Sequence, residues 1–167
     1  SYESITTESL TLTHLLKSKP KPFIGVIHRL DRVTSGVLIF AKNKSNLVAF
    51  NRLFYNRKVQ KTYLAIVKNK PPKNSGVLIN YLKKNNAEKK AEVQLSQSNE
   101  AKESILSYKL IDQNDFGYLL EVKPKSGRFH QIRVQLAHIG SPILGDVKYG
   151  ADDVYKRLSI CLHAWKI

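Results

Sequence analysis

The most informative stretch of this chain spans residues 127–150 and reads GRFHQIRVQLAHIGSPILGDVKYG. Alternation of apolar residues in its first half would suit a strand, but Ile132, Leu136 and Ile139 also fall on one face of a helix. The glycine and the proline that follow stand where a helix C-terminus commonly stops. The pattern therefore predicts a helix within residues 129–139.

A second stretch, residues 28–36, reads HRLDRVTSG and lies between two apolar segments, 23–27 and 37–41, which we predict to be strands. Asp31 is thus expected in a loop at a strand end, before a turn formed by residues 34–36. An aspartate in such a loop commonly hydrogen-bonds nearby backbone amides. The motif alone leaves a structural and a catalytic role for Asp31 open.

The other segments predict an α+β fold. Helices are expected over residues 8–17 and after an N-cap at Ser45, and the polar segment 83–92 is expected to be a mobile hairpin connection. Turn residues separate neighbouring strands, and the sequence lacks the regular βαβ spacing of a parallel sheet. We therefore expect a mixed, largely antiparallel central sheet flanked by helices. Further strands are expected at residues 62–67, 77–82, 93–95, 105–111, 118–122 and 159–163.

Composition narrows the class of protein. The chain has 167 residues, 42% of them hydrophobic, which suits one domain with its own core, and we expect residues 1–167 to form a single domain, with trimming at both ends left open. Its 28 Lys and Arg against 13 Asp and Glu give a net charge of +15, which indicates a polyanionic partner.

The apolar runs are far shorter than the ~20 residues of a membrane span, so the sequence predicts no membrane partner. The single cysteine, Cys161, excludes an internal disulfide, and no Cys/His array suits structural zinc. A reducing, cytoplasmic location is expected. The oligomeric state stays open, with a monomer expected.

Three ordered motifs resemble the RluA-type pseudouridine synthases. Residues 28–36 are similar to the family's HRLDxxTSG element, and residues 127–150 to its GRTHQIRVHLAxxGxPIxGDxxYG element. Between them, KTYLA at residues 61–65 matches the family's KxYxA strand. Phe129 and Gln135 depart from the family's usual Thr and His. The resemblance implies that residues 1–167 form a single pseudouridine synthase catalytic domain. It also implies a pseudouridine-synthase-like fold with an active-site cleft across the sheet.

The resemblance also implies an activity, the isomerisation of uridine to pseudouridine in structured RNA. This reaction breaks the N1–C1′ bond, turns the uracil and rejoins it through C5, so it needs no redox change, cofactor or metal. Asp31 matches the family's essential aspartate, as a nucleophile or as a base on the sugar. Arg133 matches the arginine that pairs with it, a contact that typically lowers a carboxyl pKa by about 1 to 3.

Tyr63 matches the family's aromatic residue that stacks on the target uracil and can take the C5 proton, although its place in a strand is equally typical of core packing. Reaching a uridine in folded ribosomal or transfer RNA requires extrusion of the nucleotide. Arg29 resembles the arginine that fills the vacated position. For His28, a structural role and contact with RNA are both open. Four further residues are expected either to support the site or to contact phosphates: Lys61, Arg128, His130 and Gln131.

Two rival functions follow from the same residues. A catalytically silent RNA-binding protein of this fold would keep the basic surface without turnover, which the intact Asp31, Tyr63 and Arg133 disfavour. A metal-dependent nuclease would need clustered carboxylates, and the histidines of the chain stand in no recognised ligand motif.

Overall fold

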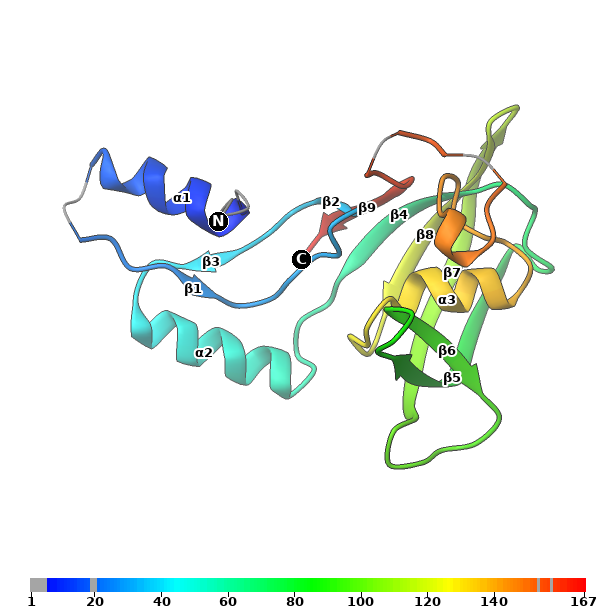
Figure 1. Cartoon of the computed structure of the whole chain (residues 1–167), viewed down its shortest axis with the longest axis horizontal. Coiled ribbons are helices and arrows are strands. Elements are labelled where there is room, and N and C mark those ends of the chain that lie inside the picture. Colours follow the sequence, from blue (N-terminus) through cyan, green and yellow to red (C-terminus); the bar gives the residue numbers. More distant parts are fainter. Residues whose placement is uncertain (1–5, 19–20, 153, 157) are drawn as a thin grey trace. The chain divides into compact units, whose positions relative to one another are not determined.

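The structure is a computed structural model that describes residues 6–18, 21–152, 154–156 and 158–167 (Figure 1). The chain divides into two compact units. The first contains the residues up to Arg29 together with Leu38–Val59, and the second contains Leu30–Val37 and Gln60–Ile167. The single catalytic domain expected from the sequence stays a prediction.

The first unit holds two helices and a short two-stranded sheet within its described residues. Helix α1 (Thr7–Leu16) confirms the helix expected over residues 8–17, and it begins with a capping box between Thr6 and Ser9. Strands β1 (Gly25–Val26) and β3 (Phe40–Ala41) pair antiparallel.

Helix α2 (Lys44–Tyr55) begins at an N-cap formed by Asn43, and the predicted cap at Ser45 is wrong. The Asn43 side chain accepts the backbone N–H of Asn46 at 2.8 Å, and Ser45 only donates to the Asn43 side chain. An asparagine two residues earlier therefore satisfies one of the free amides of the first turn. No helix in the described part of the chain is long and apolar enough to cross a membrane.

The second unit is built on a mixed sheet with the order β2-β9-β4-β8-β7-β5-β6 across the described residues. Every neighbouring pair is antiparallel except β2 and β9, which are parallel. The predicted α+β fold with a largely antiparallel sheet is therefore confirmed. Along the chain the strands are β2 (Ser35–Gly36), β4 (Thr62–Val67), β5 (Ser75–Asn85), β6 (Lys90–Gln94), β7 (Lys102–Asn114), β8 (Gly117–Pro124) and β9 (Leu162–Lys166).

Helix α3 (Gln131–His138) lies across one face of this sheet, as Figure 1 shows, and confirms the helix predicted within residues 129–139. Its buried Ile132 and Leu136 pack into the core with Leu106 and Leu120 of the sheet. The helical face was thus the correct interpretation of the ambiguous pattern. A short 3-10 helix, η1 (Val147–Tyr149), follows α3.

Three local predictions hold only in part. The hairpin expected over residues 83–92 is present, but its arms are strands: Lys83 pairs with Glu92 and Lys84 with Ala91 between β5 and β6. A polar segment forms a strand here because backbone hydrogen bonds hold the ladder whatever the side chains. Only the end of segment 37–41 belongs to a strand, and residues 35–36, expected in a turn, form β2. The last strand is Leu162–Lys166, displaced from 159–163.

Candidate active site

The loop that carries Asp31 is fastened to the second unit by its backbone. The N–H of Thr34 donates to the carbonyl of Asp31 at 2.9 Å, which closes the turn, and the N–H of Ile160 donates to the carbonyl of Val33 at 3.1 Å. Val33 also packs against the core of the unit. The Asp31 side chain is 28% exposed, so its carboxylate is held at the surface of this core.

Gly36 explains why β2 can form directly after this loop. Its φ of +123° lies in the region that favours glycine, and a Cβ there would collide with the backbone carbonyl of Ala164 in β9. Without that side chain, β2 pairs with β9 in the register Ser35 to His163 and Gly36 to Ala164. Glycine at this position therefore fixes the Asp31 loop against the sheet.

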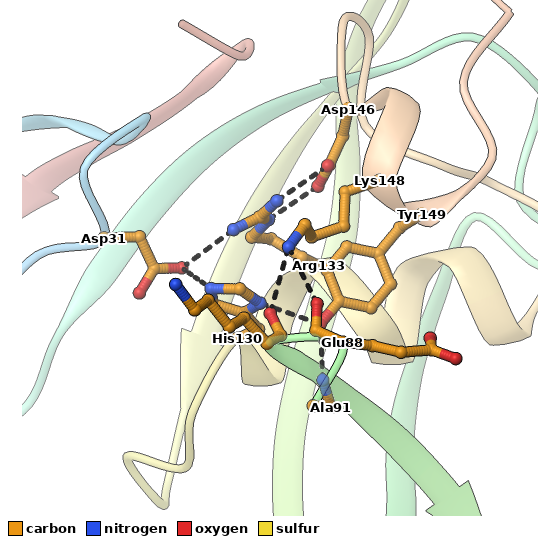
Figure 2. Close-up of polar contacts among 9 residues, drawn as sticks. Asp31, Glu88, Ala91, His130, Arg133, Asp146, Lys148 and Tyr149 are labelled. Atoms are coloured by element: carbon orange, nitrogen blue, oxygen red, sulfur yellow. Dashed lines mark hydrogen bonds and ion pairs between the residues drawn. The ribbon is translucent and has the colours of Figure 1, made fainter. Parts of the chain in front are cut away.

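Arg133 links two carboxylates, as Figure 2 shows. Its Nε and Nη2 donate to the two carboxylate oxygens of Asp146 at 2.7 and 2.8 Å, a bidentate pair. Its Nη1 lies 3.5 Å from Oδ2 of Asp31. Burial acts to lower the pKa of Arg133, but the hydrogen bonds and charge of Asp146, with the charge of Asp31, outweigh it and raise the pKa. Arg133 therefore stays cationic although only 5% of its side chain is exposed.

His130 faces the same Asp31 oxygen as Arg133. Its Nε2 is 3.8 Å from Oδ2 of Asp31, and its Nδ1 is 2.8 Å from the hydroxyl of Tyr149. The residue is the N-cap of α3 with a φ of +50°, a left-handed conformation that costs a residue other than glycine about 1–2 kcal/mol. Backbone strain of this kind clusters at functional sites.

Tyr149 completes this arrangement. Its hydroxyl accepts the backbone N–H of Ala91 in β6 at 2.7 Å, and the guanidinium carbon of Arg133 lies 4.9 Å from its ring centre. Burial, the largest cause, raises the pKa of Tyr149 to about 12, so its hydroxyl keeps its proton at neutral pH. The phenol thus ties η1 to the β5–β6 hairpin beside Arg133.

Tyr63 lies in β4, opposite Val122 of β8 and Ala164 of β9. It is half-buried and packs against the core, which is the alternative that its strand pattern left open. Burial raises the pKa of Tyr63, and the negative charge of Asp31 raises it further. Tyr63 therefore packs against the core and is close enough to Asp31 for the charge of the carboxylate to act on its hydroxyl.

Two of the predicted RNA-contacting residues, His28 and Arg29, belong to the first unit. The ring of His28 stacks on Phe54 of α2 at 5.5 Å, and its Nε2 accepts the backbone N–H of Ile39 at 3.1 Å. These contacts fit the structural role considered for His28. Arg29 is exposed.

Lys61, Arg128 and Gln131 belong to the second unit. Gln131 is buried: its Oε1 accepts from the Ser126 hydroxyl at 2.9 Å and from the backbone N–H of Arg128 at 3.1 Å, so it supports this loop. Arg128 is exposed, and its Nε donates to the carbonyl of Glu103 at 3.4 Å. Burial lowers the pKa of Lys61.

Sequence reasoning missed the main partner of Arg133. The resemblance did not single out Asp146 as a site residue, yet its carboxylate binds the guanidinium with both oxygens. A signal was present: an arginine between the buried helix positions Ile132 and Leu136 needs a compensating charge, and Asp146 is the one acidic residue in segment 127–150. No feature of the sequence predicted the hydrogen bond between His130 and Tyr149.

Gln135, one of the departures from the resembled motif, has a structural place. It is fully buried, and its amide nitrogen donates to the Asn80 side chain at 2.8 Å and to the carbonyl of Ser104 at 3.2 Å, which ties α3 to β5 and β7. Over the described ranges, no group of three or more His, Cys, Asp or Glu residues could hold a metal ion.

Comparison with known proteins identifies the family. The family model described as RNA pseudouridylate synthase matches residues 3–138. The chain belongs to the RluA-type family of RNA pseudouridine synthases. A relative from Haemophilus influenzae, described as an uncharacterized RNA pseudouridine synthase, is 38% identical over 86% of this chain and 62% of its own length.

Two further matches are similar in extent. The ribosomal large subunit pseudouridine synthase D of Borreliella burgdorferi is 37% identical over 86% of this chain and 44% of its own length. The solved structure of human RNA pseudouridylate synthase domain containing 1 superposes with a TM-score of 0.77 at 27% identity, covering 92% of this chain and 66% of that one. The chain thus spans about half the length of the curated relatives it matches.

Proposed function

We propose that this RluA-type protein isomerises specific uridines to pseudouridine in structured ribosomal or transfer RNA. The observation that supports this most is the line of charges Asp31, Arg133 and Asp146. Arg133 is anchored by two hydrogen bonds to Asp146 and presents its third nitrogen to Asp31 at 3.5 Å. A buried cation fixed in this way favours the ionised carboxylate that either a nucleophile or a base requires.

Asp31 is the catalytic carboxylate in this proposal, and Arg133 orients it and keeps it charged. Tyr63 stacks on the target uracil and takes the proton from C5 after the new bond has formed. The reaction conserves atoms and electrons, because uracil leaves through N1 and returns through C5 of the same base. It therefore needs no cofactor or metal.

RNA is the proposed partner, and the net charge of +15 supports it. The target nucleotide must leave its stack, which costs a few kcal/mol. Arg29, which is exposed and precedes Asp31 by two residues, fills the vacated position with its planar guanidinium. Lys61 and Arg128 contact phosphates, whereas His28 and Gln131 support the loops that they belong to. Such an enzyme works in the cytoplasm, where its substrates lie.

The test is an incubation of the chain with unmodified ribosomal and transfer RNA transcripts, followed by chemical mapping of pseudouridine. We expect new pseudouridines at a few defined positions with the natural sequence. Asp31→Asn should abolish them, while RNA affinity measured by filter binding changes less than about threefold, because the substitution keeps the shape of the side chain.

Asp115→Asn is the matched control, since it removes the same charge from an exposed turn between β7 and β8. It should leave both readouts unchanged. RNA binding without any new pseudouridine in the natural sequence would instead identify the silent RNA-binding protein. RNA cleavage suppressed by a chelator would favour the nuclease.

A further inference from the structure

His130 stands between the proposed catalytic carboxylate and the half-buried phenol of Tyr149. Its Nδ1 lies 2.8 Å from the Tyr149 hydroxyl, while Nε2 faces Oδ2 of Asp31 at 3.8 Å (Figure 2). Only 10% of the histidine side chain is exposed. The ring of Phe129 covers one side of the imidazole at 3.8 Å in a stacked arrangement. The imidazole is thus held on several sides, with one nitrogen directed at Asp31.

The hydrogen bonds of Tyr149 determine which nitrogen of His130 carries the proton. The hydroxyl oxygen already accepts the N–H of Ala91 at 2.7 Å. Within the described ranges, Nδ1 of His130 is the remaining hydrogen-bond partner of this hydroxyl, so the O–H donates to Nδ1. An imidazole that accepts at Nδ1 carries its proton on Nε2 when it is neutral. The N–H therefore points toward Asp31.

The groups around the imidazole keep it neutral. Burial is the largest cause that lowers the pKa of His130 to about 4, and the positive charges of Arg133, Lys148 and Lys84 lower it further. Asp146 acts in the opposite direction, and the Asp31 carboxylate also faces the ring, 3.8 Å from Nε2. Lys84 comes from β5 and Lys148 from η1, so cations on three elements, counting α3, oppose protonation.

We propose that His130 is a positioning residue for this reaction: as the neutral Nε2–H form selected by Tyr149, it donates to Oδ2 of Asp31 when substrate is bound. The inference rests on the proposed function. At 3.8 Å the contact is not yet a hydrogen bond, and polar contacts at active sites commonly tighten in the substrate complex. Arg133 and His130 together then hold one oxygen, which fixes the direction of the other toward the nucleotide.

A neutral donor suits this place better than a second cation would. Arg133 already supplies the charge that favours ionised Asp31, and an imidazolium would attract the carboxylate more strongly and weaken it as a nucleophile or base. The Nε2–H can steer the carboxylate without adding charge. This gives a chemical reason for a histidine that is buried, strained at its backbone and bonded to a phenol.

The first experiment measures the tautomer directly. Long-range ¹H–¹⁵N spectra of the full chain with labelled histidine are recorded from pH 5.5 to 8, and His130→Asn identifies the signals of His130. We expect a protonated Nε2 and an unprotonated Nδ1 across this range. Tyr149→Phe keeps the ring beside Arg133 but removes the hydroxyl, and should produce a mixture of both tautomers. A proton on Nδ1, or a tautomer unaffected by Tyr149→Phe, would overturn the inference.

The second experiment measures turnover on the RNA that the natural sequence modifies. His130→Asn is used because asparagine tolerates the left-handed backbone of this position. We expect kcat to fall about 10- to 100-fold with KM within about threefold, since small errors in the placement of a reacting group cost this much. His138→Asn, at the exposed end of the same helix, is the matched control and should keep full activity.

The two proposals fail in different ways. If the natural sequence forms no pseudouridine, the proposed function fails, while the spectra still decide whether Tyr149 selects the tautomer of His130. If the natural sequence is active and folded His130→Asn has the same kcat, the positioning role is wrong and the function stands. Equal losses of kcat and of folded protein in His130→Asn would also count against a positioning role, and Tyr149→Phe checks that result independently.

Discussion

Arg133 divides its guanidinium between two carboxylates, with Asp146 bound by two nitrogens at 2.7 and 2.8 Å and Asp31 reached by the third at 3.5 Å. The short contacts involve a side chain that is 1% exposed, and the long contact involves one that is 28% exposed. The buried pair is therefore the anchor, and the exposed carboxylate is the one able to react. The stability of this protein depends on Nε and Nη2 of Arg133, and its proposed activity depends on Nη1.

Asp146→Asn should destabilise the protein strongly. The substitution keeps the shape of the side chain but leaves the Arg133 charge buried without its bidentate partner, a change that typically costs about 3–5 kcal/mol. Urea denaturation followed by circular dichroism measures the free energy of unfolding. Asp152→Asn, an exposed neighbour, is the control and should change it by less than about 0.5 kcal/mol. A loss below about 1 kcal/mol for Asp146→Asn would contradict the anchor role.

Gly36→Ala should destabilise the protein more than Gly140→Ala, because it adds a steric clash to the backbone strain that both substitutions cause. The new Cβ would meet the carbonyl of Ala164, so β2 must leave β9 and the Asp31 loop loses its attachment. Gly140 also has a positive φ, +78°, but a Cβ there would meet nothing within 4 Å, so Gly140→Ala carries the strain alone. We expect about 1 kcal/mol for Gly140→Ala and a clearly larger loss for Gly36→Ala, together with lost pseudouridine formation. Equal losses would mean that the β2–β9 contact contributes nothing.

His130 should make stability depend on pH. Its pKa is lowered from 6.5 to about 4 in the folded chain, so between these values the unfolded chain binds more protons. The free energy of unfolding therefore falls as the pH falls from about 6.5 to about 4, by up to about 3 kcal/mol from this residue. Chemical denaturation of the natural sequence and of His130→Asn at several pH values isolates the contribution as their difference. A difference that does not change with pH would show that His130 protonates freely in the folded state.

RNA affinity should fall steeply with salt. If about six of the basic residues neutralise phosphates, the logarithm of the association constant falls with the logarithm of salt concentration at a slope of roughly −4 to −5. Fluorescence anisotropy with a labelled ribosomal RNA fragment measures this slope. Replacing exposed Arg128 by Gln should make it shallower by about 1. A slope near −1 in the natural sequence would mean that phosphates contribute little.

The sequence was sufficient for the class of fold and for the order of most elements. The apolar face of Ile132 and Leu136 predicted α3 because a helix on a sheet must bury such a stripe, and the alternation in residues 62–67 predicted β4 at its observed bounds. It was insufficient where backbone pairing overrides local chemistry. The arms of the hairpin at residues 83–92 are strands because they pair with each other, and Ser35–Gly36 form a strand because β9, distant in sequence, supplies their hydrogen bonds.

The site was predictable in part for the same reason. The motif resemblance singled out Asp31 and Arg133, and the structure brings their side chains together. A local sequence pattern does not show which residues a side chain contacts. It therefore could not predict that Asp146 binds two nitrogens of the Arg133 guanidinium. Nor could it predict that the Tyr149 hydroxyl contacts both His130 and the backbone of β6. These contacts depend on the path of the chain after α3.

The parallel pairing of β2 with β9 has a consequence for biosynthesis. The segment just after Asp31 is fastened to a strand whose residues follow it by 128 positions, as the Ser35–His163 contact illustrates. During translation, the Asp31 loop, the central hairpins and α3 are all made before β9. Until β9 has been made, β2 has no strand to pair with. Chains that end before β9 should therefore lack the attachment of this loop and form no pseudouridine, and the proposed activity should appear only once residue 166 has left the exit tunnel.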